Sequence, residues 1–212
     1  MRILSLGERA FVVYDLPAPA YRLAGQINAS RPSWLSEACP SYDTLGLYVS
    51  EPTGPSVIEA LITATRAVEL PLPKTHRIPV CYELGEDLID AASELELSPN
   101  ALIEAHSGVT YTCYAVGFTP GFPYLGYLPD RIAGLSRRKS PRVSVPTGAV
   151  GIAGNQTGIY PASTPGGWQL IGRTPLTLVD LAGGYFPISA GDGVLFRAIG
   201  REEFHQLEGQ RL

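Results

Sequence analysis

The fold of this 212-residue chain is decided by residues 141–161, which read PRVSVPTGAVGIAGNQTGIYP. Glycine and proline interrupt apolar runs of strand length here, a pattern that favours short strands joined by tight turns. Similar runs lie at 110–118, 168–173, 176–180 and 194–199, and within the quoted stretch we expect strands at 143–153 and 158–160. Many short strands with this punctuation predict a closed β-barrel.

The earlier part of the chain alternates strand and helix patterns. Strand-length apolar runs and apolar residues at helical spacing predict strands at 2–6, 10–14, 34–38, 45–49 and 77–82, and helices at 20–29, 56–70, 86–95 and 99–105. Ser98 is suited to cap the last helix, with Pro99 at its first position, where a missing N–H costs nothing.

A linker divides these patterns into two parts. Residues 70–74 read LPLPK, which is typical of a linker. Before it, helices that follow pairs of strands are typical of a small sheet covered on one face. The sequence therefore predicts an α+β domain over residues 1–74, followed by a mainly-β barrel domain over residues 75–212.

The composition excludes several classes of function. Hydrophobic residues make up 45% of the chain, enough to bury a core, whereas charged residues make up only 17%. The formal charge of −4 offers no general attraction to phosphate backbones or anionic lipid. We therefore expect no nucleic-acid partner and no membrane association. The opening apolar run at 3–6 is too short for a secretory signal, so a cytoplasmic location is expected.

Familiar catalytic and metal motifs are missing from the sequence. It contains no GxxxxGK[ST] phosphate loop, no HExxH and no GxSxG. Its cysteines, at 39, 81 and 113, are far apart and never form CxxC. We therefore expect three reduced cysteines and no metal site.

The most informative segment is 143–172, thirty consecutive residues without a charge. Uncharged loops that carry aromatic residues often mark a pocket or an interface. Arg142 enters this segment as a cation able to hold a carboxylate or phosphate, while Thr147, Gln156 and Thr164 offer neutral donors and acceptors. A small, planar, anionic amide would suit this set of groups.

Each of these residues also has a structural interpretation. Arg142 ends the basic run RRKSPR at 137–142, which could be a solvated loop. Phe122 and Trp168 could be core residues rather than ligand contacts. His106 lies where a helix gives way to a strand, so a capping or core role competes with acid–base chemistry.

Three long motifs resemble one known family. The runs GFTPGFPYLGYLP (117–129), PRVSVPTGAVGIAGNQTGIYP (141–161) and STPGGWQLIGRTPL (163–176) are similar to those of the KipI family, also described as allophanate hydrolase subunit 1 and as the PxpB-like B subunit of 5-oxoprolinase. The opening LGERAFVVYD at 6–15 fits the family more loosely.

The resemblance implies that the second domain is a cyclophilin-like β-barrel and that the chain works as a non-autonomous subunit. Its partners would be a larger subunit of the KipA or PxpC type and a third, lactam-utilisation subunit of the PxpA type. Such a complex opens the lactam 5-oxoproline to glutamate at the expense of ATP, which would bind at the level of the complex. By the resemblance, matched residue by residue, the substrate pocket would be formed by Phe122, Arg142, Thr147, Gln156, Tyr160, Thr164 and Trp168. His106 is an outlying candidate for the same pocket. The resemblance assigns no catalytic residue.

The same resemblance leaves other functions open. A KipI-type protein inhibits a sensor histidine kinase, and related domains in urea carboxylase handle carboxyl transfer to urea. The barrel type alone also suggests a peptidyl-prolyl isomerase. Because one fold serves several chemistries, the motifs by themselves do not choose among these functions.

Overall fold

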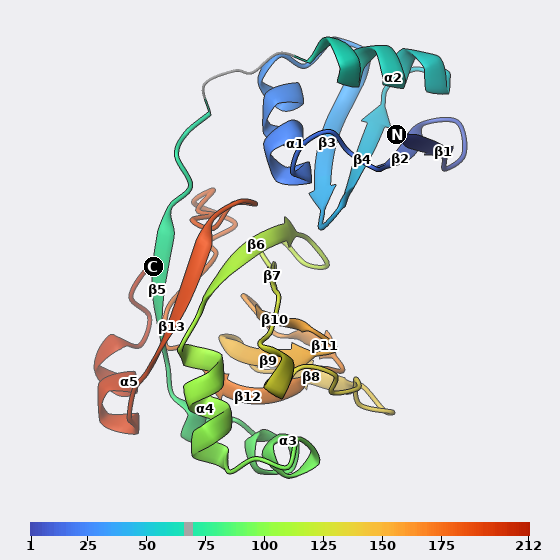
Figure 1. Ribbon diagram of the computed structural model, residues 1–212. Coiled ribbons are helices and arrows are strands. Elements are labelled where there is room, and N and C mark those ends of the chain that lie inside the picture. The colour runs from blue at the N-terminus through green and yellow to red at the C-terminus, as the bar shows by residue number, and fades with distance from the viewer. Residues whose placement is uncertain (66–69) are drawn as a thin grey trace. The chain divides into compact units, whose positions relative to one another are not determined.

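The computed structural model describes residues 1–65 and 70–212. The chain divides into two compact units, Met1–Pro73 and Lys74–Leu212, both drawn in Figure 1. Among the described residues, no helix is long and apolar enough to cross a membrane.

The first unit is a four-stranded antiparallel sheet with two helices (Figure 1). Its strands, in the order β1-β2-β4-β3, and its helices are β1 (Arg2–Ser5), β2 (Ala10–Tyr14), β3 (Leu35–Ser41), β4 (Thr44–Val49), α1 (Ala20–Ala29) and α2 (Pro55–Ala64). Alternate residues of β2 and β4 are buried and pack with both helices in one core, as expected for strands with one covered face. The centre of this core is formed by Phe11, Val13, Ile27, Leu45, Leu47 and Ile58.

The helix predicted at 56–70 is shorter in the structure. α2 ends at Ala64, because Thr65 has an extended backbone (φ −62°, ψ 120°) and its hydroxyl donates to Leu61 O at 2.8 Å. A threonine that bonds back to the preceding turn competes with continuation of the helix. Residues 66–69 of the predicted helix lie outside the described residues.

The second unit is built on a seven-stranded sheet with the order β12-β9-β10-β7-β6-β13-β5. Among these described strands, only β13 and β5 pair in parallel. The strands are β5 (Thr75–Val80), β6 (Thr110–Val116), β7 (Pro123–Gly126), β9 (Ala149–Ala153), β10 (Gln156–Ile159), β12 (Gln169–Arg173) and β13 (Gly193–Ala198).

The two edge strands of this sheet meet and almost close it into a barrel. Immediately after β5, Cys81 forms an antiparallel bridge with Arg173 at the end of β12. Cys81 N donates to Arg173 O at 2.8 Å, and Arg173 N donates to Cys81 O at 3.1 Å. Bonding between the edges removes unpaired backbone groups that an open sheet would expose. The mixed α/β fold with a barrel-like sheet agrees with the coarse architecture predicted from the sequence.

Two predicted strands differ from the observed ones. The run at 143–153 is broken by a turn, so that β8 (Arg142–Val145) leaves the barrel sheet and pairs with β11 (Thr164–Gly166). Gly148 makes the turn with φ +81°, and an added Cβ would lie 2.3 Å from Thr174 O. The run at 176–180 is not a strand and contributes only isolated bridges.

Helices and short 3₁₀ turns flank the sheet of the second unit. They are η1 (Tyr82–Leu84), α3 (Leu88–Glu94), α4 (Pro99–Ser107), η2 (Asp130–Ile132) and α5 (Arg201–Leu207). The predicted cap of α4 is confirmed, because Ala101 N donates to Ser98 Oγ at 3.2 Å and Pro99 begins the helix. α5 has no counterpart among the elements predicted from the sequence.

A buried polar chain crosses the core of the second unit at His106. Its Nδ1 lies 2.7 Å from Tyr82 Oη, its Nε2 lies 2.8 Å from Thr157 Oγ1, and its ring stacks on Phe196 at 4.5 Å. Thr157 Oγ1 in turn donates to Gly151 O at 3.0 Å. One arrangement of protons satisfies every group: the tyrosine donates to Nδ1, and Nε2–H donates to the threonine. This arrangement requires a neutral imidazole.

We predict that His106 makes the protein less stable in acid. Complete burial lowers the pKa of His106 from 6.5 to about 3. Between these values the unfolded chain binds a proton that the folded chain does not, so the free energy of unfolding should rise with pH. One such proton corresponds to a slope of about 1.4 kcal/mol per pH unit, fully developed near pH 4 to 5 and absent above about pH 7.

Urea unfolding of the wild type and His106→Gln at several pH values between 4 and 7 measures this slope. The substitution should flatten the pH dependence, whereas His205→Gln on α5, where the side chain is 72% exposed, should leave it unchanged. An equal slope in wild type and His106→Gln would contradict the assignment.

Candidate functional site

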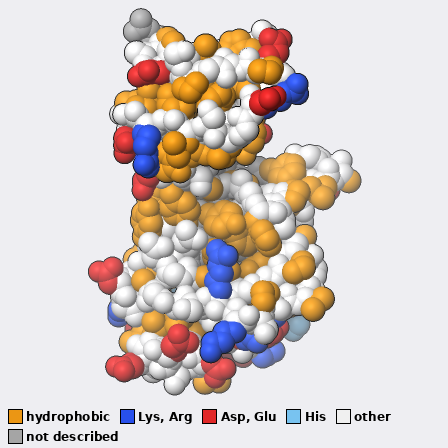
Figure 2. All heavy atoms as spheres, turned by 90° about the vertical axis from the view of Figure 1, so that its right-hand side faces the viewer, with side chains coloured by type: hydrophobic (Ala, Val, Ile, Leu, Met, Phe, Trp, Pro, Cys, Tyr) orange, Lys and Arg blue, Asp and Glu red, His pale blue; other side chains and the backbone are white. Residues whose placement is uncertain are grey.

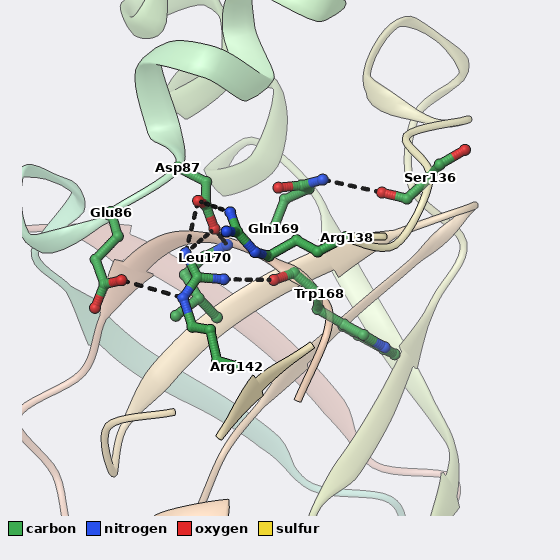
Figure 3. A network of polar contacts seen from close by, with 8 residues as sticks. All are labelled: Glu86, Asp87, Ser136, Arg138, Arg142, Trp168, Gln169 and Leu170. Carbon is green, nitrogen blue, oxygen red and sulfur yellow. Dashed lines mark hydrogen bonds and ion pairs between the residues drawn. The ribbon is translucent and has the colours of Figure 1, made fainter. Parts of the chain in front are cut away.

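The carboxylate of Asp87 is the centre of a buried ionic network (Figure 3). Asp87 precedes α3 and is only 4% exposed. Arg142 Nη2 donates to both of its oxygens, at 2.6 and 2.8 Å, and Arg138 Nη1 donates to Oδ1 at 3.0 Å. Leu170 N donates to Oδ2 at 2.7 Å, and Asp87 N returns a bond to Leu170 O at 2.8 Å. One residue thus joins the start of α3 to β12 and to the loop before β8.

Arg142 is committed to this network. Besides Asp87, its Nε donates to Glu86 Oε2 at 3.2 Å and its Nη1 to Trp168 O at 3.5 Å. Partial burial alone would lower the pKa of Arg142, but its bonds to Asp87 and Glu86 raise it above the ordinary value. The carboxylates that Arg142 holds therefore belong to the chain itself, and Arg142 does not line the cavity described next.

Beside the network lies an aromatic cavity of about 290 Å³. Its lining consists of Phe118, Phe122, Tyr124, Arg137, Arg138, Pro141, Tyr160, Pro165, Gly166, Gly167 and Trp168. In the view of Figure 2, hydrophobic side chains of the second unit, in the lower part of the picture, lie beside Lys and Arg side chains. A concave apolar surface with few polar groups is the usual form of a small-molecule site.

Phe122 organises the aromatic walls. Its ring packs edge-on against those of Tyr124 at 4.9 Å, Tyr160 at 5.1 Å and Trp168 at 5.6 Å. Such edge-to-face contacts are favourable and hold the rings in fixed orientations. Phe122, Tyr160 and Trp168 are at most 5% exposed, so they serve as core residues and as the floor of the cavity.

Phe118 forms the exposed rim of the cavity. It is 61% exposed and has φ +66°, in the left-handed region that costs a side chain backbone strain. Its ring packs edge-on against Phe122 at 5.6 Å. An exposed aromatic ring held in a strained conformation is a feature of binding sites more than of packing.

Two glycines leave room for the aromatic rings. A Cβ at Gly158 would lie 2.8 Å from Cζ of Phe122, and a Cβ at Gly166 would lie 2.6 Å from the hydroxyl oxygen of Tyr160. Both distances are below van der Waals contact. The glycine-rich composition of this segment therefore has a local cause in the packing of the cavity floor.

The residues predicted for the site are distributed over several places. Phe122, Tyr160 and Trp168 line the cavity, and Thr164 lies next to the lining residue Pro165. Of the others, Thr147 is in the turn after β8, Gln156 begins β10, and His106 is fully buried with both ring nitrogens bonded.

Sequence reasoning missed some lining residues, above all Arg137 and Arg138. They belong to the basic run at 137–142 that directly precedes the uncharged segment. A basic run directly before an uncharged, aromatic segment could have indicated cations at the cavity. The local sequence does not, however, distinguish an arginine that lines the cavity from one that pairs with Asp87.

A second cavity, of about 560 Å³, lies beside Thr119 and Pro120. It is larger, but its two charged lining residues, Asp180 and Arg211, pair with each other at 2.6 Å. None of its lining residues is aromatic. We therefore take the smaller cavity as the candidate site. Within residues 1–65 and 70–212, no group of three or more His, Cys, Asp or Glu side chains could hold a metal ion.

Comparison with known proteins connects these features with a family. Residues 1–184 match the family model of the carboxyltransferase domain, subdomain C and D. A curated relative, the B subunit of 5-oxoprolinase from Bacillus subtilis, is 50% identical over 137 residues, which are 60% of this chain and 54% of that protein. The chain thus spans about half the length of the curated relatives that it matches.

Crystal structures of similar proteins share the fold. TTHA0988 superposes with a TM-score of 0.79 at 34% identity, over 90% of this chain and 40% of that one. A conserved uncharacterized protein of Pyrococcus horikoshii, PH0987, matches with a TM-score of 0.57 at 33% identity, over 96% of this chain and all of that one.

We predict that Asp87→Asn destabilises the second unit. Removing the charge leaves the guanidinium of Arg142, whose side chain is 14% exposed, without its main partner. Breaking a buried ion pair from one side costs about 3 kcal/mol or more of unfolding free energy. Urea unfolding measures the loss, with Asp90→Asn, an exposed position in the first turn of α3, as the matched control. A loss below about 1 kcal/mol would show that the network is not a structural centre.

Proposed function

The chain belongs to the family of carboxyltransferase domains, subdomain C and D, which includes the KipI-like proteins, and we propose that it is a subunit of an ATP-dependent 5-oxoprolinase. The observation that carries the proposal is the aromatic cavity. Its walls come from 118–124 and 160–168, within the motifs that resemble the B subunit of 5-oxoprolinase. The half-length match to relatives of that name supports the same assignment.

The cavity suits a small lactam. A planar five-membered ring can lie against the rings of Phe122, Tyr160 and Trp168, while polar groups orient it. Burial raises the pKa of Tyr124 and of Tyr160, so both hydroxyls stay protonated near neutral pH. They are therefore neutral hydrogen-bond donors for an amide oxygen.

The lining contains no side chain suited to act as a nucleophile with an adjacent base. Among the lining residues there is no Ser, Cys, His, Asp or Glu. A lactam without ring strain is a poor electrophile, and phosphorylation of its oxygen by ATP would activate it for attack by water. The ring C–N bond then breaks, the nitrogen takes up protons, and a second water hydrolyses the resulting acyl phosphate, so that the products are glutamate, ADP and phosphate. In this scheme the chain supplies position and charge, and partner subunits supply ATP and the reacting groups.

We assign the partners by the same reasoning. The relatives are each named as one lettered subunit of 5-oxoprolinase, which implies further subunits. We take these to be a larger subunit of the KipA or PxpC type and a lactam-utilisation subunit of the PxpA type. In TTHA0988 the matched fold is 40% of a longer chain, which fits a protein that works beside other domains. A cytoplasmic location fits the three free cysteines of the chain.

We also propose domain boundaries and a barrel type for the chain. We regard residues 1–74 as an α+β domain and residues 75–212 as a cyclophilin-like barrel. The bridge between Cys81 and Arg173, which links the two edge strands, supports a barrel.

A carboxyl-transfer role is the second candidate. It is favoured by the description of the family model, which names a carboxyltransferase domain. The same cavity would then hold a small acyclic amide such as urea. Product analysis separates the two functions, because ring opening releases glutamate and carboxyl transfer does not.

We predict that glutamate formation from 5-oxoproline and ATP requires this chain. The chain is coexpressed with its larger and third partner subunits, and the purified complex is assayed with and without it. Omission should abolish activity, because the lactam loses its binding site. Unchanged glutamate release without the chain would contradict the proposal.

A rim variant locates the site within the assembled complex. Phe118→Ala should raise KM for 5-oxoproline, because it removes an exposed wall of the cavity. Phe186→Ala, also an exposed phenylalanine but outside the lining, should leave KM unchanged. Equal effects of both substitutions would point to a general surface effect.

A further inference from the structure

We propose that Arg137 binds the carboxylate of the ligand in the aromatic cavity and so selects an anionic lactam over a neutral one. This inference rests on the proposed 5-oxoprolinase function and extends it to a residue that the family motifs did not single out.

The cations around the cavity differ in their partners. Two of its lining residues are cations, Arg137 and Arg138. Arg138 donates to Asp87, and Arg142, farther along the same basic run, is held by Asp87 and Glu86. Arg137, by contrast, forms no ion pair with any residue in 1–65 or 70–212. Its charge is therefore available to an incoming anion.

The backbone on either side of Arg137 is anchored. On one side, Ser136 O accepts a bond from Gln169 Nε2 at 3.0 Å, drawn in Figure 3. On the other, Arg138 N donates to Gly167 O at 2.7 Å, in addition to its side-chain bond to Asp87. Both neighbours of Arg137 are thus tied to the segment 167–169. The backbone that carries Arg137 is therefore fixed, and binding of a ligand has to order only the side chain.

Arg137 also lies near the tyrosines of the cavity. Burial raises the pKa of Tyr124 and of Tyr160, and the positive charge of Arg137 opposes this effect at both, joined by Arg142 at Tyr160. Both tyrosines line the cavity. Arg137 thus lines the cavity beside these tyrosines without an ion pair among the described residues, whereas the adjacent Arg138 pairs with Asp87.

The chemistry of the ligand follows from these groups. A guanidinium recognises a planar carboxylate through two parallel hydrogen bonds. The phenol groups can donate to an amide oxygen, and the rings accept a flat apolar face. A cavity of about 290 Å³ is at the small end of ligand pockets, which favours a compact ring over a nucleotide. The set of groups thus fits a small cyclic amide that carries a carboxylate.

The test is steady-state kinetics of the full complex with the Arg137→Gln subunit. KM for 5-oxoproline should rise by about tenfold or more while kcat changes less than threefold, because a bond to a non-reacting carboxylate is made before and during the reaction. Arg137→Lys should recover part of the affinity. Lys139→Gln, which removes a cation of the same loop that does not line the cavity, should leave KM within twofold of the wild type.

Two further measurements separate binding from structure and from the function itself. Arg137 forms no ion pair among the described residues, so Arg137→Gln should leave the midpoint of urea unfolding unchanged. Arg142→Gln should lower this midpoint, because it removes a partner of Asp87. An Arg137→Gln complex with KM within twofold of the wild type would overturn the inference, and so would a tenfold rise caused equally by Lys139→Gln. A wild-type complex that releases no glutamate from 5-oxoproline would instead overturn the proposed function, and this inference with it.

Discussion

The candidate site depends on the ion pairs and hydrogen bonds that the carboxylate of Asp87 accepts. This carboxylate accepts bonds from two guanidinium groups and from the backbone of Leu170, and it is almost completely buried. A buried charge is tolerated only when such bonds compensate its loss of water. Here the compensation also has a geometric effect, because its donors come from the loop before β8, from the start of β8 and from β12. The loop before β8, which contributes Arg137 and Arg138 to the cavity wall, is thereby held against β12, the strand that begins directly after Trp168.

This constraint separates the roles of three arginines in one basic run, residues 137–142. Arg138 and Arg142 neutralise Asp87, so that their charge is used within the protein. Arg137 lies between two anchored neighbours, and we infer that its charge serves the cavity. The aromatic rings beside it hold one another in place, since Phe122 packs against four of them. Arg137 is itself exposed, so a carboxylate can reach it from solvent.

The second buried polar system, at His106, shows a different use of hydrogen bonds. It is neutral, and each of its polar side-chain atoms has a partner within the core of the second unit. It ties α4 and η1 to β9 and β10 without reaching the cavity. The contrast shows why a histidine beside family motifs need not contact substrate: a satisfied neutral imidazole has no free nitrogen for a ligand.

Local features of the sequence determined much of the fold and the place of the cavity, because caps, turns, strand lengths and aromatic composition depend on near neighbours. The Ser98 cap is one example, whereas the helix predicted at 56–70 was too long because the bond from Thr65 to the preceding turn outweighed apolar periodicity. Charge pairing was decided only by the tertiary structure. The sequence leaves Arg142 open between a ligand contact and a solvated loop, and the structure pairs it with Asp87, 55 residues away in the chain. Neighbouring cations of one basic run look alike in sequence, and an ion pair depends on distance in space and not on separation along the chain.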